Sequence, residues 1–386
     1  MWLLLKLLAR TIKQGRFTLI DARGNRHVFG ASHPDFPDVV MRFADDGVAG
    51  SIVRNPRLAF GEAWLDGRIF FDQGGLADFL TLFRKNASWE NGGEWLKPHG
   101  LVRRVLGSLM ARLDRINWER KSKRHVAHHY NLDDRLFDLF LDADRQYSCA
   151  YFTDEGNSLE QAQLDKKAHI AAKLALSPGQ RVLDIGCGWG GMALYLAQNF
   201  DCHVTGITLS TEQLALARER AEQAGVAGRT EFALIDYRNL AESGRQFDRI
   251  VSVGMFEHVG RPQFDTFFEA VSHLLPDQGV MLLHTIGRMG QPSRTDDFTD
   301  RYIFPGGYIP ALSEVIGSSE KFRLIPADVE TLRLHYARTL RAWYARCLTN
   351  RAAIERMYDE RFFRMWTFYL AGSTAAFESG GMCNYQ

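Results

Sequence analysis

The chain has 386 residues, of which 46% are hydrophobic and 24% are charged, a composition typical of a globular protein with about two domains. Its 47 Lys and Arg residues are almost balanced by 46 Asp and Glu residues, so no global field draws it to nucleic acid, and any anionic partner must be met by a local patch. Five cysteines without CxxC or CxxH spacing argue against a disulfide framework or a zinc site and indicate a reducing cytoplasm.

The first segment, MWLLLKLLARTIKQG, predicts an amphipathic helix. At helical period, its basic residues share one face, while Leu4, Leu8 and Ile12 share the other. Because Lys6 interrupts the apolar run and no small-residue cleavage site follows, we expect no cleaved signal peptide. We expect the helix to pack on its own domain, and a helix lying on a membrane surface is the alternative.

Residues 16–85 mix short alternating apolar runs with turn signals such as RGN and DDG, which predicts a small α+β domain. Together with a Gly-, Asn- and Pro-containing linker at 87–100, this N-terminal domain spans 1–100, and lipid binding is one role for it. Residues 101–125 predict a basic helical linker, with Lys and Arg concentrated between 103 and 124. Such a charge run is usually a solvated helix face. It is also the segment best suited to contact anionic lipid headgroups.

From about residue 158, long helices alternate with short apolar strands, which indicates βαβ units and a parallel sheet. Ser158 and Gln161 form a capping box that opens the first of these helices. Strands are expected at residues 181–187, 203–209, 230–236, 248–256 and 279–286. Residues 288–320 predict a lid or helical insertion, and residues 336–378 predict two aromatic-rich helices. The predicted fold is α/β, with a doubly wound Rossmann-like sheet, a helical insertion and a small N-terminal α+β domain.

The run VLDIGCGWGG places Gly186, Gly188 and Gly190 in a tight turn from a strand into a helix, where backbone amides can approach a ligand. A glycine-rich turn alone is weak evidence, because dinucleotide-binding enzymes use a similar one. Two details favour S-adenosylmethionine. Asp184 lies ahead of the glycines, where its carboxylate can position the ammonium group of the cofactor's methionine part, and the GxGxG spacing differs from the GxGxxG that seats a pyrophosphate.

The acidic residue that usually binds the ribose hydroxyls, about 20 residues after the glycine loop, is missing from the sequence. The second strand leads instead to Thr208, Ser210 and Gln213, so an uncharged polar group or water must substitute. Gln213 also stands three residues after Ser210, which fits a capping box equally well. After the third strand, Asp236 and Tyr237 occupy positions where adenine contacts are expected.

The fourth and fifth strands lead to Glu257 and His284. Strand ends at the carboxyl edge of a doubly wound sheet line the ligand crevice, so these two side chains can converge on one small ligand. The alternative for Glu257 is to cap the helix that follows. We expect His258 to be structural.

Seven motifs occur in this order along the chain: RQYSCAYF, VLDIGCGWGG, GITLS, MFEHVG, LLHTIG, FPGGYIP and HYARTLRAWY. They resemble those of the cyclopropane-fatty-acyl-phospholipid synthases, from about residue 124 to the end, whereas VLDIGCGWGG alone would indicate only a methyltransferase. The resemblance implies an S-adenosylmethionine-dependent methyltransferase-fold catalytic domain at 126–386. That enzyme transfers a methylene group to the cis double bond of an unsaturated phospholipid acyl chain, with bicarbonate in the active site. The chain stops at GGMCNYQ, where the family's last strand would begin, so we expect a weakened sheet edge.

The resemblance also implies which residues form the site. Bicarbonate would be bound around Cys149, Glu257, His284, Ile286 and Tyr336. The cofactor would be bound around Tyr147, Ser148, Gly186, Gly188, Thr208 and Gln213. In this site Glu257 would accept the bicarbonate hydroxyl in a hydrogen bond, while His284, Tyr336 and backbone amides donate. Cys149 would contribute a backbone contact, because no activating base lies near it in sequence. The rings of Tyr302, Phe304 and Tyr308 either shield a cation or pack in the core.

Two other functions stay open. One is a methyltransferase of the same fold that gives a methyl-branched or methylene lipid without ring closure, or that methylates an amine. The other is a lipid-binding protein that has lost catalysis, against which the intact cofactor loop argues. The expected partners are an anionic phospholipid bilayer surface and an unsaturated phospholipid, with no nucleic acid, and a homodimer stays open. We expect a cytoplasmic enzyme peripherally associated with the inner face of the membrane.

Overall fold

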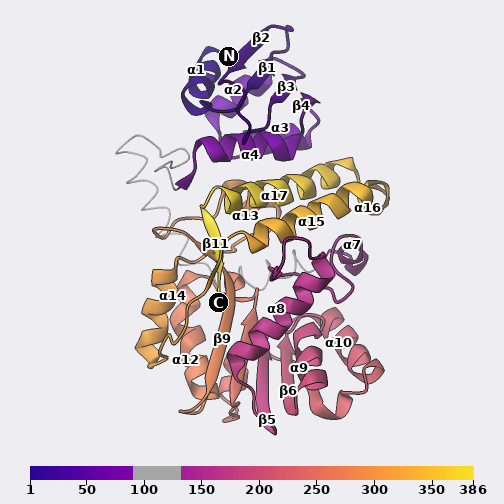
Figure 1. Cartoon of the computed structure of the whole chain (residues 1–386), viewed down its shortest axis with the longest axis vertical. Helices are drawn as coiled ribbons and strands as arrows, with labels where there is room; N and C mark the ends of the chain where they lie inside the picture. Colours follow the sequence, from indigo (N-terminus) through magenta and orange to yellow (C-terminus); the bar gives the residue numbers. More distant parts are fainter. Residues whose placement is uncertain (90–131) are drawn as a thin grey trace. The chain divides into compact units, whose positions relative to one another are not determined.

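The computed structural model describes residues 1–89 and 132–386, and its contacts divide the chain into two compact units (Figure 1). The first unit comprises Met1–His129, Thr295–Gly306 and Leu340–Met382. The second comprises Tyr130–Arg294, Gly307–Thr339 and Cys383–Gln386. The predicted basic linker at 101–125, and most of the linker at 87–100, lie outside the described residues.

The first unit contains a four-stranded sheet in the order β2-β1-β3-β4. Its strands are β1 Phe17–Ile20, β2 Arg26–Phe29, β3 Val39–Phe43 and β4 Ile69–Gln73. Its N-terminal helices are α1 Trp2–Thr11, α2 Gly47–Arg54, α3 Ala59–Leu65 and α4 Leu76–Asn86. Leu4, Leu8 and Ile12 are buried in the core of this unit. The predicted packing of the first helix on its own domain is therefore confirmed.

The C-terminal part of the chain also belongs to the first unit, so this unit is not contiguous in sequence. It contains α16 Arg351–Met357, α17 Glu360–Glu378, the part of α15 His335–Thr349 from Leu340 on, and α13 Asp297–Tyr302. Helix α17 contacts α3 and α4, and the Trp64 indole donates to the Arg364 carbonyl at 3.1 Å. This grouping differs from the contiguous domains expected at 1–100 and 126–386, because an apolar face of α17 is buried against the N-terminal helices.

Three helices, rather than the expected two, occupy residues 335–378. A break separates α15 from α16 at Asn350, and another separates α16 from α17. The second break is set by Asp359, whose carboxylate accepts a hydrogen bond from the Phe362 amide and so caps the start of α17.

The second unit is built on a seven-stranded sheet in the order β10-β11-β9-β8-β5-β6-β7. The strands are β5 Gln180–Ile185, β6 Cys202–Thr208, β7 Thr230–Leu234, β8 Arg249–Val253, β9 Val280–Arg288, β10 Thr331–Leu332 and β11 Met382–Tyr385. The pairs β5–β6, β6–β7, β5–β8 and β8–β9 are all parallel. All five predicted strands and the doubly wound Rossmann-like sheet are confirmed.

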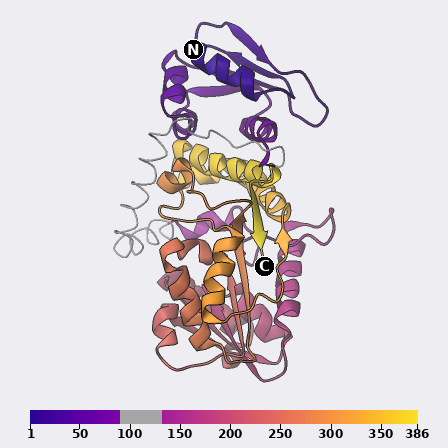
Figure 2. The same cartoon turned by 90° about the vertical axis from the view of Figure 1, so that its left-hand side faces the viewer.

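Helices cover both faces of this sheet (Figure 1 and Figure 2). The helices are α7 Asp134–Asp138, α8 Leu159–Leu174, α9 Gly191–Asn199, α10 Thr211–Gln223, α11 Tyr237–Ala241, α12 Phe264–Leu274 and α14 Leu312–Ser319. Short 3₁₀ helices span Ala227–Arg229, Phe256–His258, Arg261–Gln263 and Glu320–Phe322. Two hydrophobic cores lie on the two faces of the sheet. Val182 of β5 packs in one core with α8, α9 and α10, and Leu183 of β5 packs in the other with α11, α12 and α14. Adjacent β5 residues thus point to opposite faces, as a strand period of two requires.

The C-terminal residues form a strand inside this sheet. Strand β11 lies between β10 and β9 and pairs antiparallel with β10, and Cys383 and Asn384 are buried. The expected weakened edge at this position is therefore wrong, because the residues after Gly381 already complete the pairing. The predicted insertion at 288–320 does contain helices, α13 and α14, and its role as a lid stays a prediction. Within residues 1–89 and 132–386, no helix combines the length and apolarity needed to cross a bilayer.

Candidate active site

The glycine loop joins β5 to α9 in the predicted place. Gly186, Gly188 and Gly190 all have positive φ, at 80°, 54° and 85°. A Cβ at Gly186 would lie 2.6 Å from the Met255 side chain, whereas a Cβ at Gly188 would meet nothing within 4 Å. The backbone at Gly188 therefore borders open space, which fits the expectation that a ligand approaches the main chain there.

Asp184 is held just before this loop with an unsatisfied carboxylate oxygen. Its side chain is only 2% exposed, and its Oδ2 atom is buried without a hydrogen-bond partner. Burial raises the Asp184 pKa to about 7, and the positive charge of Lys166 acts in the opposite direction. A buried carboxylate oxygen without a partner is costly. The cofactor's ammonium group would satisfy it, so these residues fit S-adenosylmethionine.

The polar residues after β6 form a small buried cluster. The Thr208 hydroxyl donates to Gln213 Oε1 at 2.8 Å and accepts from the Ser210 amide at 3.2 Å. Ser210 is the N-cap of α10, because its hydroxyl accepts from the Gln213 amide. The capping role is confirmed for Ser210, whereas the Gln213 side chain reaches Thr208. Ribose binding by these residues stays a prediction.

The residues expected near adenine already have structural contacts. Asp236 caps α11 by accepting from the Arg238 amide at 2.9 Å, and its carboxylate is paired with the Arg238 guanidinium at 2.7 Å. The Tyr237 ring packs edge-on against Phe267 with centroids 5.3 Å apart, and burial raises its pKa to about 12. An adenine contact by either residue stays a prediction.

The segment that carries Tyr147 and Ser148 is attached to α8. Lys166 Nζ donates to Gln146 Oε1 at 2.7 Å and to Ser148 Oγ at 2.8 Å. Gln163 Nε2 donates to the main-chain carbonyls of Gln146 and Ser148 at 3.2 Å and 3.1 Å. No sequence motif indicates Gln146, Gln163 or Lys166 as part of the site. The sequence signal that could have found two of them is the presence of a polar residue, Gln163, and a charged residue, Lys166, three positions apart on the buried face of an amphipathic helix.

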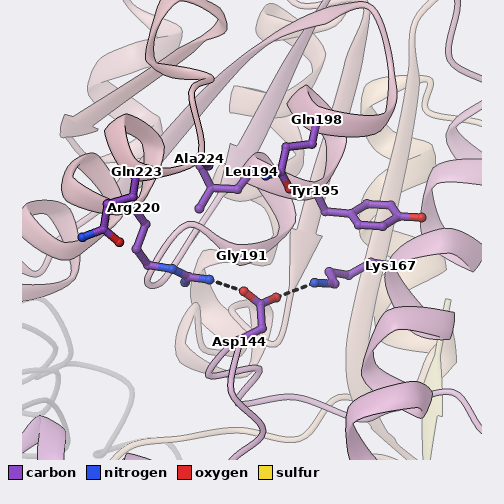
Figure 3. A pocket seen from close by; sticks show the side chains of 9 residues that line it. All are labelled: Asp144, Lys167, Gly191, Leu194, Tyr195, Gln198, Arg220, Gln223 and Ala224. Atoms are coloured by element: carbon purple, nitrogen blue, oxygen red, sulfur yellow. Dashed lines mark hydrogen bonds and ion pairs between the residues drawn. The ribbon is translucent and has the colours of Figure 1, made fainter.

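A polar cavity of about 260 Å³ lies beside this segment (Figure 3). It is lined by Asp144, Lys167, Gly191, Leu194, Tyr195, Gln198, Arg220, Gln223 and Ala224. The Asp144 carboxylate lies between Lys167, at 2.5 Å, and Arg220, and the Arg220 guanidinium also donates to the Trp189 carbonyl. The Asp144 carboxylate thus links the start of the segment to α8 through Lys167 and to α10 through Arg220, and Arg220 in turn contacts the glycine loop. The Lys167 and Arg220 cations lower its pKa against the effect of burial.

Glu257 lies in the 3₁₀ helix after β8 and faces the end of β9. Its Oε1 atom accepts from the Ile286 amide at 2.6 Å, while its Oε2 atom is buried without a hydrogen-bond partner. Burial raises the Glu257 pKa to about 7. Gln263 occupies the N-cap position of α12. Glu257 is therefore not the cap of that helix, and its free oxygen fits a protonated ligand such as the hydroxyl of bicarbonate.

His284 is fully buried on β9, where two amide side chains contact its ring. Its Nε2 and Nδ1 atoms lie 2.9 Å from Asn384 Nδ2 and 3.0 Å from Gln386 Nε2. A neutral imidazole has one donor and one acceptor, so one of the two amides must present its oxygen. Burial lowers the His284 pKa to about 3. The expected donation to bicarbonate stays a prediction, and it would have to replace one of these contacts.

Asn384 and Gln386 are further residues of the site that no sequence motif indicates. The two residues are spaced i, i+2 at the end of the chain, a spacing that places them on one face of the last strand. That spacing is a weak signal, because their partner lies about one hundred residues away and no local pattern indicates it.

Cys149 and Tyr336 lie on two adjoining segments. Cys149 is 1% exposed, and burial raises its thiol pKa, so the thiol stays protonated and is not an activated nucleophile. At the start of α15, Thr339 Oγ1 accepts from the Ala150 amide at 3.0 Å, and His335 Nδ1 accepts from the Phe152 amide at 2.9 Å. Tyr336, which is buried in the same turn, therefore lies near the chain that follows Cys149.

This segment also approaches the end of β8. A Cβ at Gly254 would lie 3.5 Å from Ser148 Cβ, and the Gly254 amide donates to the His284 carbonyl at 2.9 Å. The structure thus brings the 147–149 segment, the end of β8 and the end of β9 to one edge of the sheet. The bicarbonate and cofactor roles of these residues stay predictions.

The remaining candidates have packing contacts. Tyr302 donates to Glu62 Oε1 at 2.9 Å, and Phe304 packs against Tyr369, both inside the first unit. Tyr308 donates its hydroxyl to Glu314, and its amide donates to the Glu257 carbonyl at 3.0 Å. These contacts support the packing interpretation for Tyr302 and Phe304 and place the Tyr308 backbone beside Glu257. Burial lowers the His258 pKa to about 4, which agrees with a structural role.

A family model described as mycolic acid cyclopropane synthetase matches residues 118–386. The chain belongs to this family. The cyclopropane-fatty-acyl-phospholipid synthase of Escherichia coli K12 is 40% identical over 330 residues, which cover 85% of this chain and 81% of that relative. A tuberculostearic acid methyltransferase of Mycobacterium tuberculosis is 32% identical over 402 aligned positions, which cover 99% of this chain and 89% of that relative. The resemblance seen in the motifs is confirmed.

Solved structures of the same family have the same fold. The cyclopropane synthase MmaA2 from Mycobacterium tuberculosis matches with a TM-score of 0.64 and 33% identity, over 68% of this chain and 96% of that chain. A mycolic acid cyclopropane synthase in complex with SAH and CTAB matches with a TM-score of 0.64 and 32% identity, over the same shares. The protein is therefore an enzyme of the cyclopropane synthase family, an S-adenosylmethionine-dependent methyltransferase that acts on lipid.

Proposed function

We propose that the protein converts the cis double bond of an unsaturated phospholipid acyl chain into a cyclopropane ring, with a bound bicarbonate as the general base. The observation that carries this proposal is the buried, unpartnered Oε2 atom of Glu257 at the carboxyl edge of the sheet. Family membership and 40% identity to a phospholipid-modifying relative support the choice of substrate.

S-adenosylmethionine supplies the methyl group in this reaction, and bicarbonate supplies a weak base for the proton that leaves on ring closure. An isolated alkene is a poor nucleophile, so the protein must hold it at near-attack distance and exclude water. The Gly188 backbone and the free Asp184 oxygen would receive the cofactor's methionine part. A strongly basic side chain would risk alkylation. That risk favours a site in which Glu257 holds an exchangeable anion instead of taking the proton itself.

An ionised Glu257 repels another anion unless a proton of that anion lies between them in a hydrogen bond. Its Oε1 atom is already occupied by the Ile286 amide, so Oε2 is the atom that would accept the hydroxyl of bicarbonate. With a pKa of about 7, the carboxylate is about half ionised at neutral pH. Ring formation should therefore rise with pH through this range, as more of the enzyme carries an ionised Glu257.

We also place the enzyme on an anionic bilayer as a peripheral protein, and helix α1 supports this placement. Trp2, Leu3 and Leu7 are 68%, 53% and 41% exposed, although other leucines of the same helix are buried. Lys6 lies over the Trp2 ring at 5.2 Å, and α1 contains no Asp or Glu. Exposed apolar side chains beside basic ones are the pattern of an interfacial helix. The basic segment 103–124, the other expected contact, lies outside the described residues.

Turnover of unsaturated phospholipid vesicles by Glu257→Gln tests the proposal. The amide introduced by this substitution keeps an oxygen for the Ile286 amide but offers no carboxylate to the bicarbonate hydroxyl. Turnover should fall by about 10²–10³, while cofactor affinity stays near that of the unmodified protein. Added bicarbonate should restore part of the rate. Equal losses of cofactor affinity and turnover would show that Glu257 is a cofactor ligand, and unchanged turnover would remove it from the mechanism.

A second product stays open, because one relative is described as a probable fatty acid methyltransferase at 40% identity over 68% of this chain. If the ring did not close, the cation left by methyl transfer would lose a proton to give a methylene lipid, and a saturated methyl branch would need a hydride donor. Ring closure and methylene formation both release a proton and so require an acceptor at the site, and Glu257 with its free oxygen favours either of them over a methyl branch. Hydrogenation of the lipid product separates a methylene group, which is reduced, from a ring, which is left as it is. Mass spectrometry separates a saturated methyl branch from both, because that product carries two more hydrogens.

A further inference from the structure

A lysine is completely enclosed in the second unit beside the predicted cofactor site. Lys166 lies in the middle of α8 and is 0% exposed. Among the described residues, no carboxylate forms a salt bridge with it, and its contacts are the Gln146 amide oxygen at 2.7 Å and the Ser148 hydroxyl at 2.8 Å. Burial lowers its pKa to about 8, so the group is still mostly protonated at pH 7. An enclosed cation without a paired anion is costly.

The two partners of Lys166 flank Tyr147, and further bonds fix the same turn. Gln163, three residues earlier on α8, donates to both carbonyls of the turn, at 3.2 Å and 3.1 Å. The main-chain amide of Gln146 donates to Asp142 Oδ1 at 2.9 Å. Two residues of α8 therefore hold this turn. The Lys166 ammonium binds the side chains of the turn, and the neutral Gln163 amide binds its main-chain carbonyls.

The other side of the turn faces the catalytic edge of the sheet. Ser148 Cβ would lie 3.5 Å from a Cβ at Gly254, in the loop that leads to Glu257. Lys166 is also the charge that favours the ionised form of Asp184, against the effect of burial. A displacement of the Lys166 ammonium would thus alter both the turn and the carboxylate expected to meet the cofactor.

We propose that Lys166 is a positioning residue for S-adenosylmethionine, which fixes Gln146 and Ser148 so that residues 146–149 form a constant wall of the cofactor site. The inference rests on the proposed function in taking Tyr147 and Ser148 as cofactor contacts. A lysine suits this role because its ammonium has three donors and no acceptor, so it can satisfy two oxygens at once. A neutral side chain of the same length would leave both oxygens buried without a donor.

Lys166→Met removes the ammonium and both hydrogen bonds while keeping a long unbranched side chain. Isothermal titration calorimetry with S-adenosylmethionine should give a dissociation constant about tenfold or more above that of the unmodified protein. The turnover number at saturating cofactor should change much less, because the wall forms again once the cofactor is bound. Amide hydrogen exchange without cofactor should become faster in 146–149 and stay unchanged in α9.

Lys173→Met is the matched control, because Lys173 lies on the same helix and pairs with Asp328 and Glu330, each at 2.7 Å. Its affinity for S-adenosylmethionine should equal that of the unmodified protein. If Lys166→Met does not fold, Gln146→Met provides a milder variant, since it keeps the lysine and the Ser148 bond. This second variant should also weaken cofactor binding and speed exchange in 146–149.

Three outcomes would contradict the inference. A folded Lys166→Met or Gln146→Met protein with normal affinity would show that the turn needs no such support. Faster exchange throughout the second unit would show that Lys166 stabilises the fold in general. If the unmodified protein itself failed to bind S-adenosylmethionine, the proposed function would fail as well, so the two failures are distinguishable.

Discussion

Glu257→Gln should remove a loss of stability that the unmodified protein undergoes as pH rises to alkaline values, although it impairs the reaction. Folding raises the Glu257 pKa from 4.5 to about 7, because burial disfavours the charged form. The folded state therefore binds more protons than the unfolded state between these values, and the free energy of unfolding falls as pH rises through that window. At about 1.4 kcal/mol for each pKa unit, ionising this carboxylate costs the folded state about 3 kcal/mol above pH 7.

The variant lacks this titration, so the difference between the two proteins should depend on pH. Urea unfolding at pH 5 and at pH 8 gives the free energy of unfolding of each protein. The value for Glu257→Gln, minus that for the unmodified protein, should increase by roughly 2 to 3 kcal/mol between the two pH values. Constant contributions, such as a buried amide without a partner, cancel in this comparison.

Asp265→Asn is a suitable control, because Asp265 is a half-exposed carboxylate whose pKa is lowered by Lys321 and Ser318. Here the sign is reversed and the titration lies at or below the ordinary Asp value of 3.8, so the difference between Asp265→Asn and the unmodified protein should change only in acid and stay flat between pH 5 and pH 8. A Glu257→Gln difference that is flat or falls between pH 5 and pH 8 would refute the assignment of Glu257 as a buried carboxylate with a raised pKa.

Three further predictions concern the cofactor loop, the membrane and the last strand. Gly188→Val should abolish S-adenosylmethionine binding in calorimetry, because a branched side chain at a φ of 54° is strained and would fill the open space above the loop; near-normal affinity would mean that the loop is misassigned. Replacing Trp2 and Leu3 with serine should weaken sedimentation with anionic vesicles at low salt, and Val28→Ser, at an exposed apolar site on β2, should not; equal binding by all three proteins would remove α1 from the interface. Asn384→Leu should lower the midpoint of urea unfolding, because a ring nitrogen of His284 loses its partner in a fully buried position; an unchanged midpoint would contradict that role.

The parallel sheet could be predicted because each strand is a short apolar run bounded by turn residues. The glycine loop could be predicted for a local reason as well, since positive φ at Gly186, Gly188 and Gly190 restricts the residue type at each position. Ser158 and Gln161 predict a capping box, and the Ser158 hydroxyl does accept the Gln161 amide, whereas the Gln161 side chain donates to Asp165. Features that depend on neighbours in sequence were therefore accessible.

Features that depend on distant neighbours were not accessible. The partners of His284 stand 100 and 102 residues later in the chain. The packing of α17 on α3 and α4 joins the two ends of the sequence, and no composition change marks it. Lys166 carried only a faint signal, a charged residue on an apolar helix face. Its function as a link between Gln146 and Ser148 became visible only from the distances.

The most direct test of ring formation uses S-adenosylmethionine with a trideuterated methyl group and vesicles of a monounsaturated phospholipid. If the methyl loses one hydrogen as the ring closes, mass spectrometry of the acyl chains should show the gain of one CD₂ group, in a product that resists hydrogenation. Retention of all three deuterium atoms would show a methyl-branched product, and a CD₂ product that takes up hydrogen would show a methylene lipid. Either result would contradict the proposal that Glu257 and bicarbonate serve ring closure.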